Sequence, residues 1–133
     1  MDVAIFGAGI AGLMSAITLQ ARGHRCHIYE RARQNQQMGM GFILVPEGIE
    51  QLHRFGVEVA GVPMCHYYCR NEAGEVIYEE TMPAGARSVR RADLVAGLMN
   101  ALRNRDIITY DAALDGLEFS SAGDVVAAQP GLA

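Results

Sequence analysis

The first thirty residues alternate between short apolar runs and a segment with helical spacing. Residues 3–6 are wholly apolar, as expected of a strand buried on both faces of a parallel sheet. Apolar side chains then recur at helical spacing from Ile10 to Leu19, and Gly23 marks the end of that helix. A second β-prone run covers residues 26–29. A strand, a helix and a strand within about 30 residues predict one βαβ unit.

Beyond this unit the pattern becomes less regular. A short strand is predicted at residues 42–45, and an amphipathic helix begins at Pro46 and ends before Gly56. Two β-prone runs, at residues 64–70 and 75–80, flank a polar turn and predict a β-hairpin. The remaining predicted elements are one helix and three short strands, at residues 92–103, 107–110, 114–119 and 125–128.

Length and composition indicate one globular domain over residues 1–133, half of them apolar and a fifth charged. A net charge of −4, without runs of basic residues, argues against nucleic acid or an anionic membrane as a partner. No apolar stretch approaches the roughly 18 residues of a membrane span, and no basic segment typical of a signal peptide opens the chain. Three cysteines without disulfide-framework spacing fit a reducing compartment, so we expect a cytoplasmic location.

The segment between the first strand and the first helix carries a nucleotide-binding motif. It reads G-x-G-x-x-G and follows a predicted strand directly before a helix, which is the context that this motif requires. The first glycine permits a tight turn, the second lets the backbone approach a pyrophosphate, and the third lets the helix pack close to the sheet. The pyrophosphate would lie at the positive end of the helix. The motif residues are Gly7, Ala8, Gly9, Ile10, Ala11 and Gly12.

An acidic residue at the end of the second strand narrows the choice of nucleotide. Glu30 follows the motif by about 20 residues, where a carboxylate accepts hydrogen bonds from ribose hydroxyls. This carboxylate disfavours a 2′-phosphate, although Arg31 beside it leaves NADP open. An NAD-type half would continue with alternating strands and helices, whereas here a Gly-Met-Gly loop and a hairpin follow. The alternative is a purely structural role, in which the glycines form only a tight turn and Glu30 is a solvated strand end.

Two arginines at the start of the third predicted helix allow two interpretations. Arg90 and Arg91 stand where the helix dipole disfavours cations, and a bound anion nearby would reconcile them with that position. Solvated arginines, or salt bridges to Glu79, Glu80 or Asp93, would do so equally well. The residues alone leave both interpretations open.

The chain resembles the FAD-dependent aromatic-ring hydroxylases, the class A flavoprotein monooxygenases. Residues 3–12 and 29–31 are similar to the family's first strand, glycine turn and second strand. Residues 38–47, which read MGMGFILVPE, are similar to its "GxGI-x-L-x-PN" loop, and residues 52–56 are similar to the "L-xx-hG" that follows. Residues 91–94 match its "R-x-D-L" at the head of a helix.

This resemblance implies FAD as the cofactor and assigns roles to further residues. Glu30 would hold the adenosine ribose, and Arg91, with Arg31, would neutralise phosphate near the pyrophosphate or ribityl chain. The strand that holds Leu114 would line the adenine. The family inserts one oxygen atom of O2 into an aromatic or similar small molecule, with NAD(P)H as a transient co-substrate. The loop residues that would lie against the flavin are Gly39, Met40, Gly41 and Phe42.

The resemblance also implies that the chain is the N-terminal third of a larger flavoprotein fold. The family's downstream "GD" and "DG" signatures have no counterpart here, and the hairpin at residues 64–80 resembles part of the substrate-domain sheet. A second segment would then complete the enzyme. Two alternatives stay open: an NAD(P)-dependent reductase, and a non-catalytic truncated module that self-associates by pairing its exposed strands with another copy.

The sequence predicts no metal site and names no catalytic residue. Cys65 and Cys69 flank an aromatic segment, but four residues of strand span roughly 13 Å, too far for one ion or one disulfide. We expect both to point to one face, as core residues do. Spacing suggests no Ser-His-Asp, Cys-His or paired-carboxylate set, which is compatible with chemistry carried by a flavin.

Overall fold

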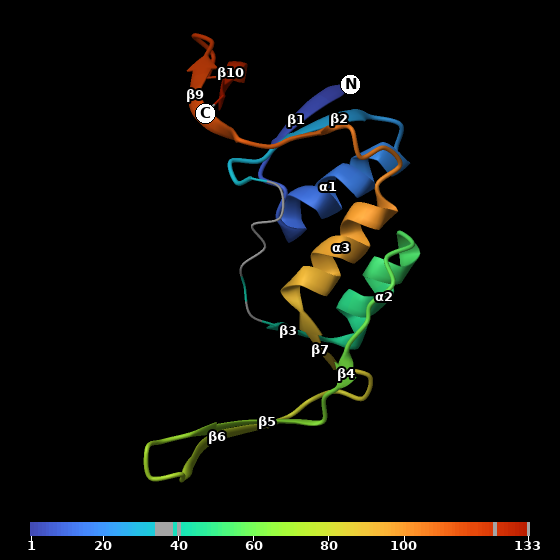
Figure 1. Cartoon of the computed structure of the whole chain (residues 1–133), viewed down its shortest axis with the longest axis vertical. Helices are drawn as coiled ribbons and strands as arrows, with labels where there is room; N and C mark the ends of the chain where they lie inside the picture. The colour runs from blue at the N-terminus through green and yellow to red at the C-terminus, as the bar shows by residue number, and fades with distance from the viewer. Residues whose placement is uncertain (34–38, 40, 124, 133) are drawn as a thin grey trace. The chain divides into compact units, whose positions relative to one another are not determined.

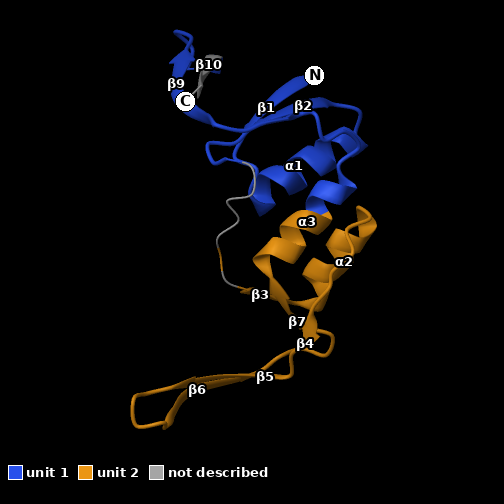
Figure 2. Cartoon of the chain, viewed as in Figure 1, with its two compact units in different colours: residues 1–37, 98–133 blue, residues 38–97 orange. Residues whose placement is uncertain are grey.

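The computed structural model describes residues 1–33, 39, 41–123 and 125–132, and the chain divides into two compact units (Figures 1 and 2). Unit 1 comprises residues 1–37 and 98–133, and unit 2 comprises residues 38–97. The mixture of helices and strands in both confirms the predicted α/β class. The expectation of one domain over residues 1–133 stays a prediction. Within the described ranges, no helix is long and apolar enough to cross a membrane.

Unit 1 begins with the predicted βαβ unit. Strand β1 (Asp2–Phe6) pairs in parallel with β2 (Arg25–Tyr29), and α1 (Ile10–Ala21) connects them. Strand β8 (Ile108–Thr109) adds in parallel to the other edge of β2, which gives the sheet order β1-β2-β8. The sheet face that packs against α1 belongs to the core of this unit. The buried apolar side chains of unit 1 are Leu13, Ala16, Ile17, Cys26, Ile28, Leu98, Leu102 and Ala112.

The two late strands of unit 1 form one antiparallel hairpin that is longer than predicted. Strand β9 (Ala112–Phe119) pairs with β10 (Val125–Leu132), with register shifts on the β10 side. One shift falls at Pro130, and a proline is tolerated in a strand at such an irregularity. The prediction ended this strand at residue 128, whereas β10 continues through Pro130 to Leu132. Strand β8 is shorter than predicted because the chain turns at Asp111, which has a positive φ of 53°.

Unit 2 contains a small antiparallel sheet and two helices. Strand β7 (Arg87–Arg90) lies between β3 (Gly41–Leu44) and β4 (Val62–Pro63). Helix α2 (Pro46–Arg54) follows β3, and α3 (Arg91–Ala101) begins directly after β7. The sequence did not predict β4 and β7, because β7 reads RSVR and buries only Val89 fully. The buried side chains of this unit are Leu52, Val57, Ala86, Val89, Leu94 and Val95.

The predicted hairpin of unit 2 is present. Strand β5 (His66–Arg70) pairs antiparallel with β6 (Val76–Thr81), and every residue of β6 is exposed. The expectation that Cys65 and Cys69 are core residues is wrong. Cys65 is exposed and Cys69 is half-buried, because none of the described residues forms a layer over either face of this hairpin.

Candidate functional site

The glycine turn between β1 and α1 has the geometry that its sequence predicts. Gly7 has a φ of +106°, which side-chain-bearing residues rarely adopt, and its N–H donates to the Tyr29 carbonyl oxygen over 2.7 Å. A Cβ atom added to Gly12 would overlap the Gly7 carbonyl oxygen. The first and third glycines of the motif are therefore required for different reasons, one by backbone conformation and one by close packing of the helix on the turn.

The start of α1 offers backbone donors without a side-chain cap. Gly9 is the N-cap residue, and the first helical hydrogen bond runs from the Leu13 N–H to the Gly9 carbonyl. Gly9 provides no side chain, and the first turn of α1 contains no acidic residue. Among the described residues, the N–H groups of Ile10, Ala11 and Gly12 have no acceptor outside the helix. Such a helix end, with its positive partial charge, favours a phosphate group.

Glu30 lies beside this turn and is held there by its carboxylate. Its Oε2 accepts the backbone N–H of Ala8 over 2.6 Å, and its Oε1 accepts the N–H of Ala32 over 2.8 Å. The Glu30 backbone also bonds to Thr109 and Ala112, at 2.8 and 3.0 Å. A carboxylate fixed in this way does not match the alternative of a solvated strand end. Its lone pairs not used by these two donors can accept hydrogen bonds from a ribose.

Two residues that the sequence did not assign to the site, Tyr110 and Asp111, lie beside Glu30. Burial, and next the Glu30 carboxylate, raise the pKa of the half-buried Tyr110 phenol. Asp111 donates its N–H to the Ala32 carbonyl over 3.4 Å, and its carboxylate pairs with Arg33 at 3.4 Å. Both residues follow β8 at the carboxyl end of a parallel strand, where ligands of α/β sheets bind. That position was the signal that could have found them.

The coupling between Tyr110 and Glu30 can be measured. We expect Glu30→Gln to lower the pKa of Tyr110, because the substitution removes the negative charge that disfavours the phenolate. The Tyr110 transition is obtained by ultraviolet titration as the difference between each protein and its Tyr110→Phe counterpart. An unchanged Tyr110 transition in Glu30→Gln would contradict the proximity of the two groups.

In unit 2 the adjacent arginines Arg90 and Arg91 have different surroundings. Arg90 forms a two-pronged salt bridge with Asp93, at 2.7 and 3.1 Å, which confirms the salt-bridge interpretation for this residue. The Arg91 guanidinium lies over the Phe42 ring, 5.9 Å from its centre, and has no acidic partner among the described residues. Its stem packs so closely on Gly39 that a Cβ there would overlap the Arg91 Cδ. Arg91 is therefore the cation of this pair that is available to an anion.

The predicted site residues fall into both units. Unit 1 contains the glycine motif, Glu30 and the exposed Arg31, together with Leu114, which is 41% exposed on β9. Unit 2 contains Gly39, Gly41, Phe42 and Arg91. Met40 lies outside the described residues, as does Met38 of the same loop. The individual roles of these residues toward a nucleotide stay predictions.

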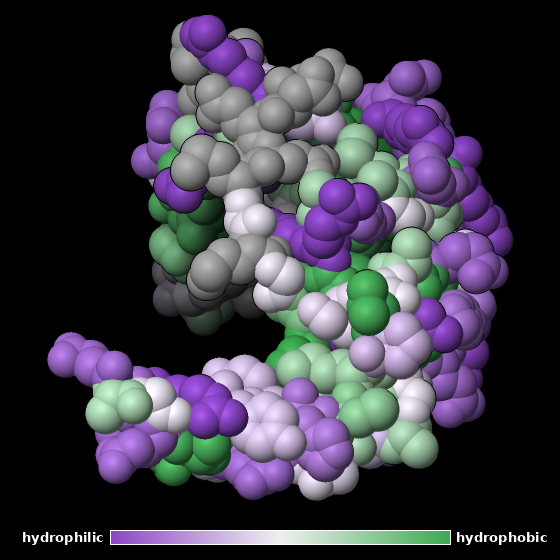
Figure 3. Space-filling model, turned by 60° about the horizontal axis from the view of Figure 1, so that its bottom comes forward, coloured by the Kyte–Doolittle hydropathy of each residue, from purple (hydrophilic) through white to green (hydrophobic). Residues whose placement is uncertain are grey.

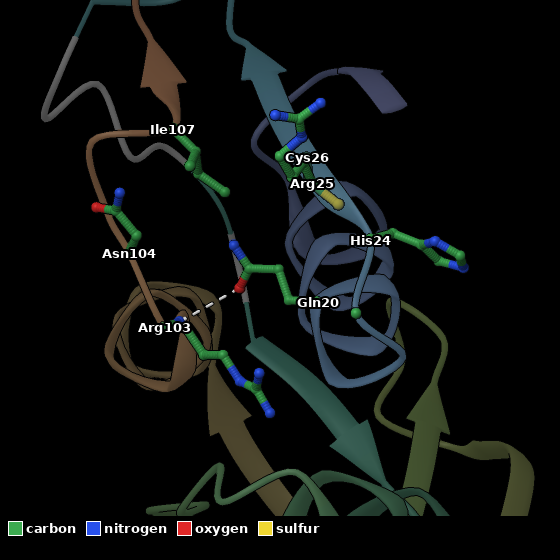
Figure 4. Close-up of a pocket in the computed structure, with 8 residues that line it drawn as sticks. Gln20, His24, Arg25, Cys26, Arg103, Asn104 and Ile107 are labelled. Atoms are coloured by element: carbon green, nitrogen blue, oxygen red, sulfur yellow. Dashed lines mark hydrogen bonds between the residues drawn. The ribbon is translucent and has the colours of Figure 1, made fainter. Parts of the chain in front are cut away.

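A cavity of about 450 Å³ lies at the other end of the parallel sheet (Figure 4). It is lined by the C-terminal end of α1, the start of β2 and the segment before β8, where the Arg103 N–H donates to the Gln20 side chain over 3.3 Å. The open sheet of an α/β fold binds its ligand at the carboxyl ends of its strands, whereas β2 begins here, at Arg25. This cavity is therefore not the nucleotide site.

A family model described as "FAD binding domain" matches residues 1–104. The chain therefore belongs to the FAD-binding domain family, and FAD is the cofactor of this family. This confirms the resemblance drawn from the glycine motif, the Gly-x-Gly loop and the R-x-D-L segment.

Curated relatives that match the chain are named as monooxygenases and hydroxylases, some of them FAD-dependent. "FAD-dependent monooxygenase OpS4" of Beauveria bassiana is 29% identical over 159 residues, which cover 99% of this chain and 37% of that protein. "3-amino-4-hydroxybenzoate 2-monooxygenase" of Streptomyces cremeus is 42% identical over 55 residues, which cover 41% of this chain and 14% of that protein. The chain thus spans little more than a third of the length of its relatives.

Solved structures show the same fold in the N-terminal part of larger enzymes. The 2,6-dihydroxypyridine-3-hydroxylase from Arthrobacter nicotinovorans matches with a TM-score of 0.70 and 27% identity, over 96% of this chain and 35% of that one. HpxO of Klebsiella pneumoniae, solved with FAD and uric acid, matches with a TM-score of 0.68 and 21% identity, over 96% and 37%. The predicted fold, an N-terminal portion of a larger flavoprotein, is confirmed.

Proposed function

We propose that this chain binds FAD through its glycine turn and Glu30, as the FAD-binding portion of a flavin-dependent monooxygenase. The observation that carries the proposal is the Glu30 carboxylate, held 2.6 Å from the Ala8 N–H inside the motif itself. This bond fixes a ribose acceptor next to the backbone donors that would bind the pyrophosphate.

The residues present fit the cofactor chemically. The start of α1 supplies N–H donors for the pyrophosphate, Glu30 supplies acceptors for the ribose, and Arg91 supplies a cation for phosphate oxygens. FAD would supply electron transfer from NAD(P)H and the activation of O2, while the protein supplies binding and orientation. We propose an aromatic or similar small molecule as the substrate, supported by the names of the relatives. Turnover would also require segments equivalent to the part of the relatives that this chain does not span. These segments would belong to the same polypeptide or to a second one.

A visible absorption spectrum tests the proposal directly. The purified chain is incubated with FAD, passed through gel filtration, and its spectrum is compared with that of the untreated protein. A retained two-band flavin spectrum is the expected result. A colourless protein that fails to take up FAD would overturn FAD binding by this chain. In a parallel incubation with NAD(P)H, retention of its near-ultraviolet band by a protein that takes up no flavin would favour the reductase alternative instead.

The two adjacent arginines provide a matched pair for the same measurement. We expect Arg91→Ala to weaken FAD binding about tenfold or more, because it removes a charge-assisted contact to phosphate. Arg90→Ala should change the affinity less than about twofold, because an exposed salt bridge to Asp93 contributes little to stability. Flavin fluorescence quenching gives both dissociation constants. Equal effects of the two substitutions would contradict a specific role for Arg91.

A further inference from the structure

The hairpin β5–β6 carries a strand edge that is free among the described residues. The Met82 N–H donates to the Cys65 carbonyl over 2.8 Å, so the backbone groups of Cys65 face the opposite strand. Inward and outward groups alternate along an antiparallel strand. The N–H and C=O groups of His66, Tyr68 and Arg70 therefore point away from β6. This row of backbone donors and acceptors forms the outer edge of β5.

Several large apolar side chains of the hairpin are exposed. Tyr68 is 47% exposed, and Ile77 on β6 is 67% exposed. Green apolar and purple polar side chains lie together at this part of the surface (Figure 3). A two-stranded hairpin alone is at best marginally stable in water, and a third strand stabilises it. The chain contains no lysine, and β5 carries no proline. The register shift of this hairpin falls between Cys69 and Arg70, at the end of β5, so the ladder from His66 to Cys69 is regular.

We propose that β5 pairs antiparallel with β5 of a second copy, about a two-fold axis at Tyr68. In this register each outward backbone group meets an outward group, because Tyr68 lies opposite Tyr68 and His66 lies opposite Arg70 of the other copy. Within one copy, the Tyr68 ring lies between two side chains of the same strand. The centre of the His66 ring is 5.9 Å from the centre of the Tyr68 ring, and the Arg70 Cζ is also 5.9 Å from it. The result is a symmetric dimer that shares one four-stranded sheet, with the two Tyr68 rings at the centre of the sheet.

Charge selects the β5 edge over the β6 edge. The equivalent pairing of β6 about Glu79 would place Glu79 directly opposite Glu79, with Glu80 nearby on each strand. Like charges directly opposite each other destabilise a sheet, and the whole chain already has a net charge of −4. Strand β5 contains no acidic residue. Pairing of β5 with β6 of another copy would leave one β5 edge and one β6 edge free, so further copies could add without limit and no closed dimer would form.

Proline substitutions at the two edges test the proposal by sedimentation velocity on the 133-residue chain. We expect a concentration-dependent dimer, and we expect Tyr68→Pro to weaken it roughly thirtyfold, because each dimer loses two backbone hydrogen bonds. The N–H of Tyr68 points outward, so the substitution spares the bonds between β5 and β6. Glu79→Pro, which removes the outward donor on the opposite edge, should leave the dimer intact. A monomer at high concentration, an open-ended series of oligomers, or equal effects of both substitutions would overturn the proposal.

A disulfide tests the register independently of any loss of stability. Residues of a hydrogen-bonded antiparallel pair have Cα atoms about 5.5 Å apart, a separation that a disulfide spans. With Cys65 and Cys69 replaced by serine, Tyr68→Cys should therefore form a cross-linked dimer under mild oxidation, whereas Glu79→Cys should not. Cross-linking through position 79 alone would overturn the assignment to β5. Neither readout depends on FAD, so the self-pairing and the proposed function can fail separately.

Discussion

Replacing Gly12 by alanine is expected to destabilise unit 1 and to abolish FAD binding. The added Cβ would overlap the Gly7 carbonyl oxygen and would approach the Ile5 Cγ2 to 3.3 Å. The atom that must move belongs to the backbone of a turn whose own N–H is bonded to Tyr29. Relief therefore requires α1 to separate from the turn. We expect a loss of about 3 kcal/mol of unfolding free energy, measured by urea denaturation followed by circular dichroism.

A glycine in the second helix provides the matched control. A Cβ added to Gly48 in α2 would meet no heavy atom within 4 Å, so Gly48→Ala should be neutral or stabilise the protein by about 0.5–1 kcal/mol. The opposite responses of the two glycines would show that the effect at Gly12 comes from the close contact with the turn. A Gly12→Ala protein with wild-type stability and FAD affinity would contradict the geometry of the turn.

Replacing Glu30 by alanine is expected to lower the affinity for FAD about a hundredfold, because hydrogen bonds to a charged acceptor are among the strong ones. The substitution removes the ribose acceptor and also leaves the N–H groups of Ala8 and Ala32 without their partner. Since Ala8 belongs to the motif, the turn loses a support at the point where the pyrophosphate would bind. Glu30→Gln should have a smaller effect, because its amide oxygen keeps one of the two bonds. Equilibrium titration with FAD gives the affinities.

An acid at the other end of the same sheet serves as the control for Glu30. Asp2 begins β1 and pairs with Arg25, but both side chains are largely exposed, at 70% and 85%. Asp2→Asn should therefore leave both FAD affinity and the stability of the protein nearly unchanged. Wild-type FAD affinity in Glu30→Ala would show that the carboxylate has only a structural role.

The glycine turn and Glu30 could be predicted because their requirements are local. A strand, three glycines and an acid at a fixed distance together specify one turn and the backbone groups around it. Tyr110 and Asp111 could not be assigned to this site in the same way. They lie next to Glu30 because β8 pairs with β2, which is far away in the sequence. The spacing of neighbouring residues does not predict such a long-range strand pairing.

The burial of the two hairpin cysteines and the partners of the two arginines also depend on tertiary contacts, which the sequence pattern does not specify. Alternation along the predicted strand 64–70 placed Cys65 and Cys69 on one face, but alternation predicts burial only if another layer covers that face. The two arginines at the junction of β7 and α3 are identical in residue type and differ only in their surroundings. Asp93 lies within reach of Arg90, whereas Arg91 packs on Phe42. Charge and helix position alone could not separate these two neighbours, whereas the resemblance to the R-x-D-L segment singled out Arg91.

The three cysteines give the molecule built-in chemical reporters. Cys26 is buried under α1, and burial raises the pKa of its thiol, so it stays inert toward maleimide while the helix covers it. Cys65 lies exposed at the base of the hairpin. The labelling rate of Cys26 therefore records the transient opening of unit 1, and the accessibility of Cys65 records whether the base of the hairpin is covered. Native cysteines alone can thus follow the stability of the nucleotide-binding unit and the state of the hairpin in a single mass-spectrometry experiment.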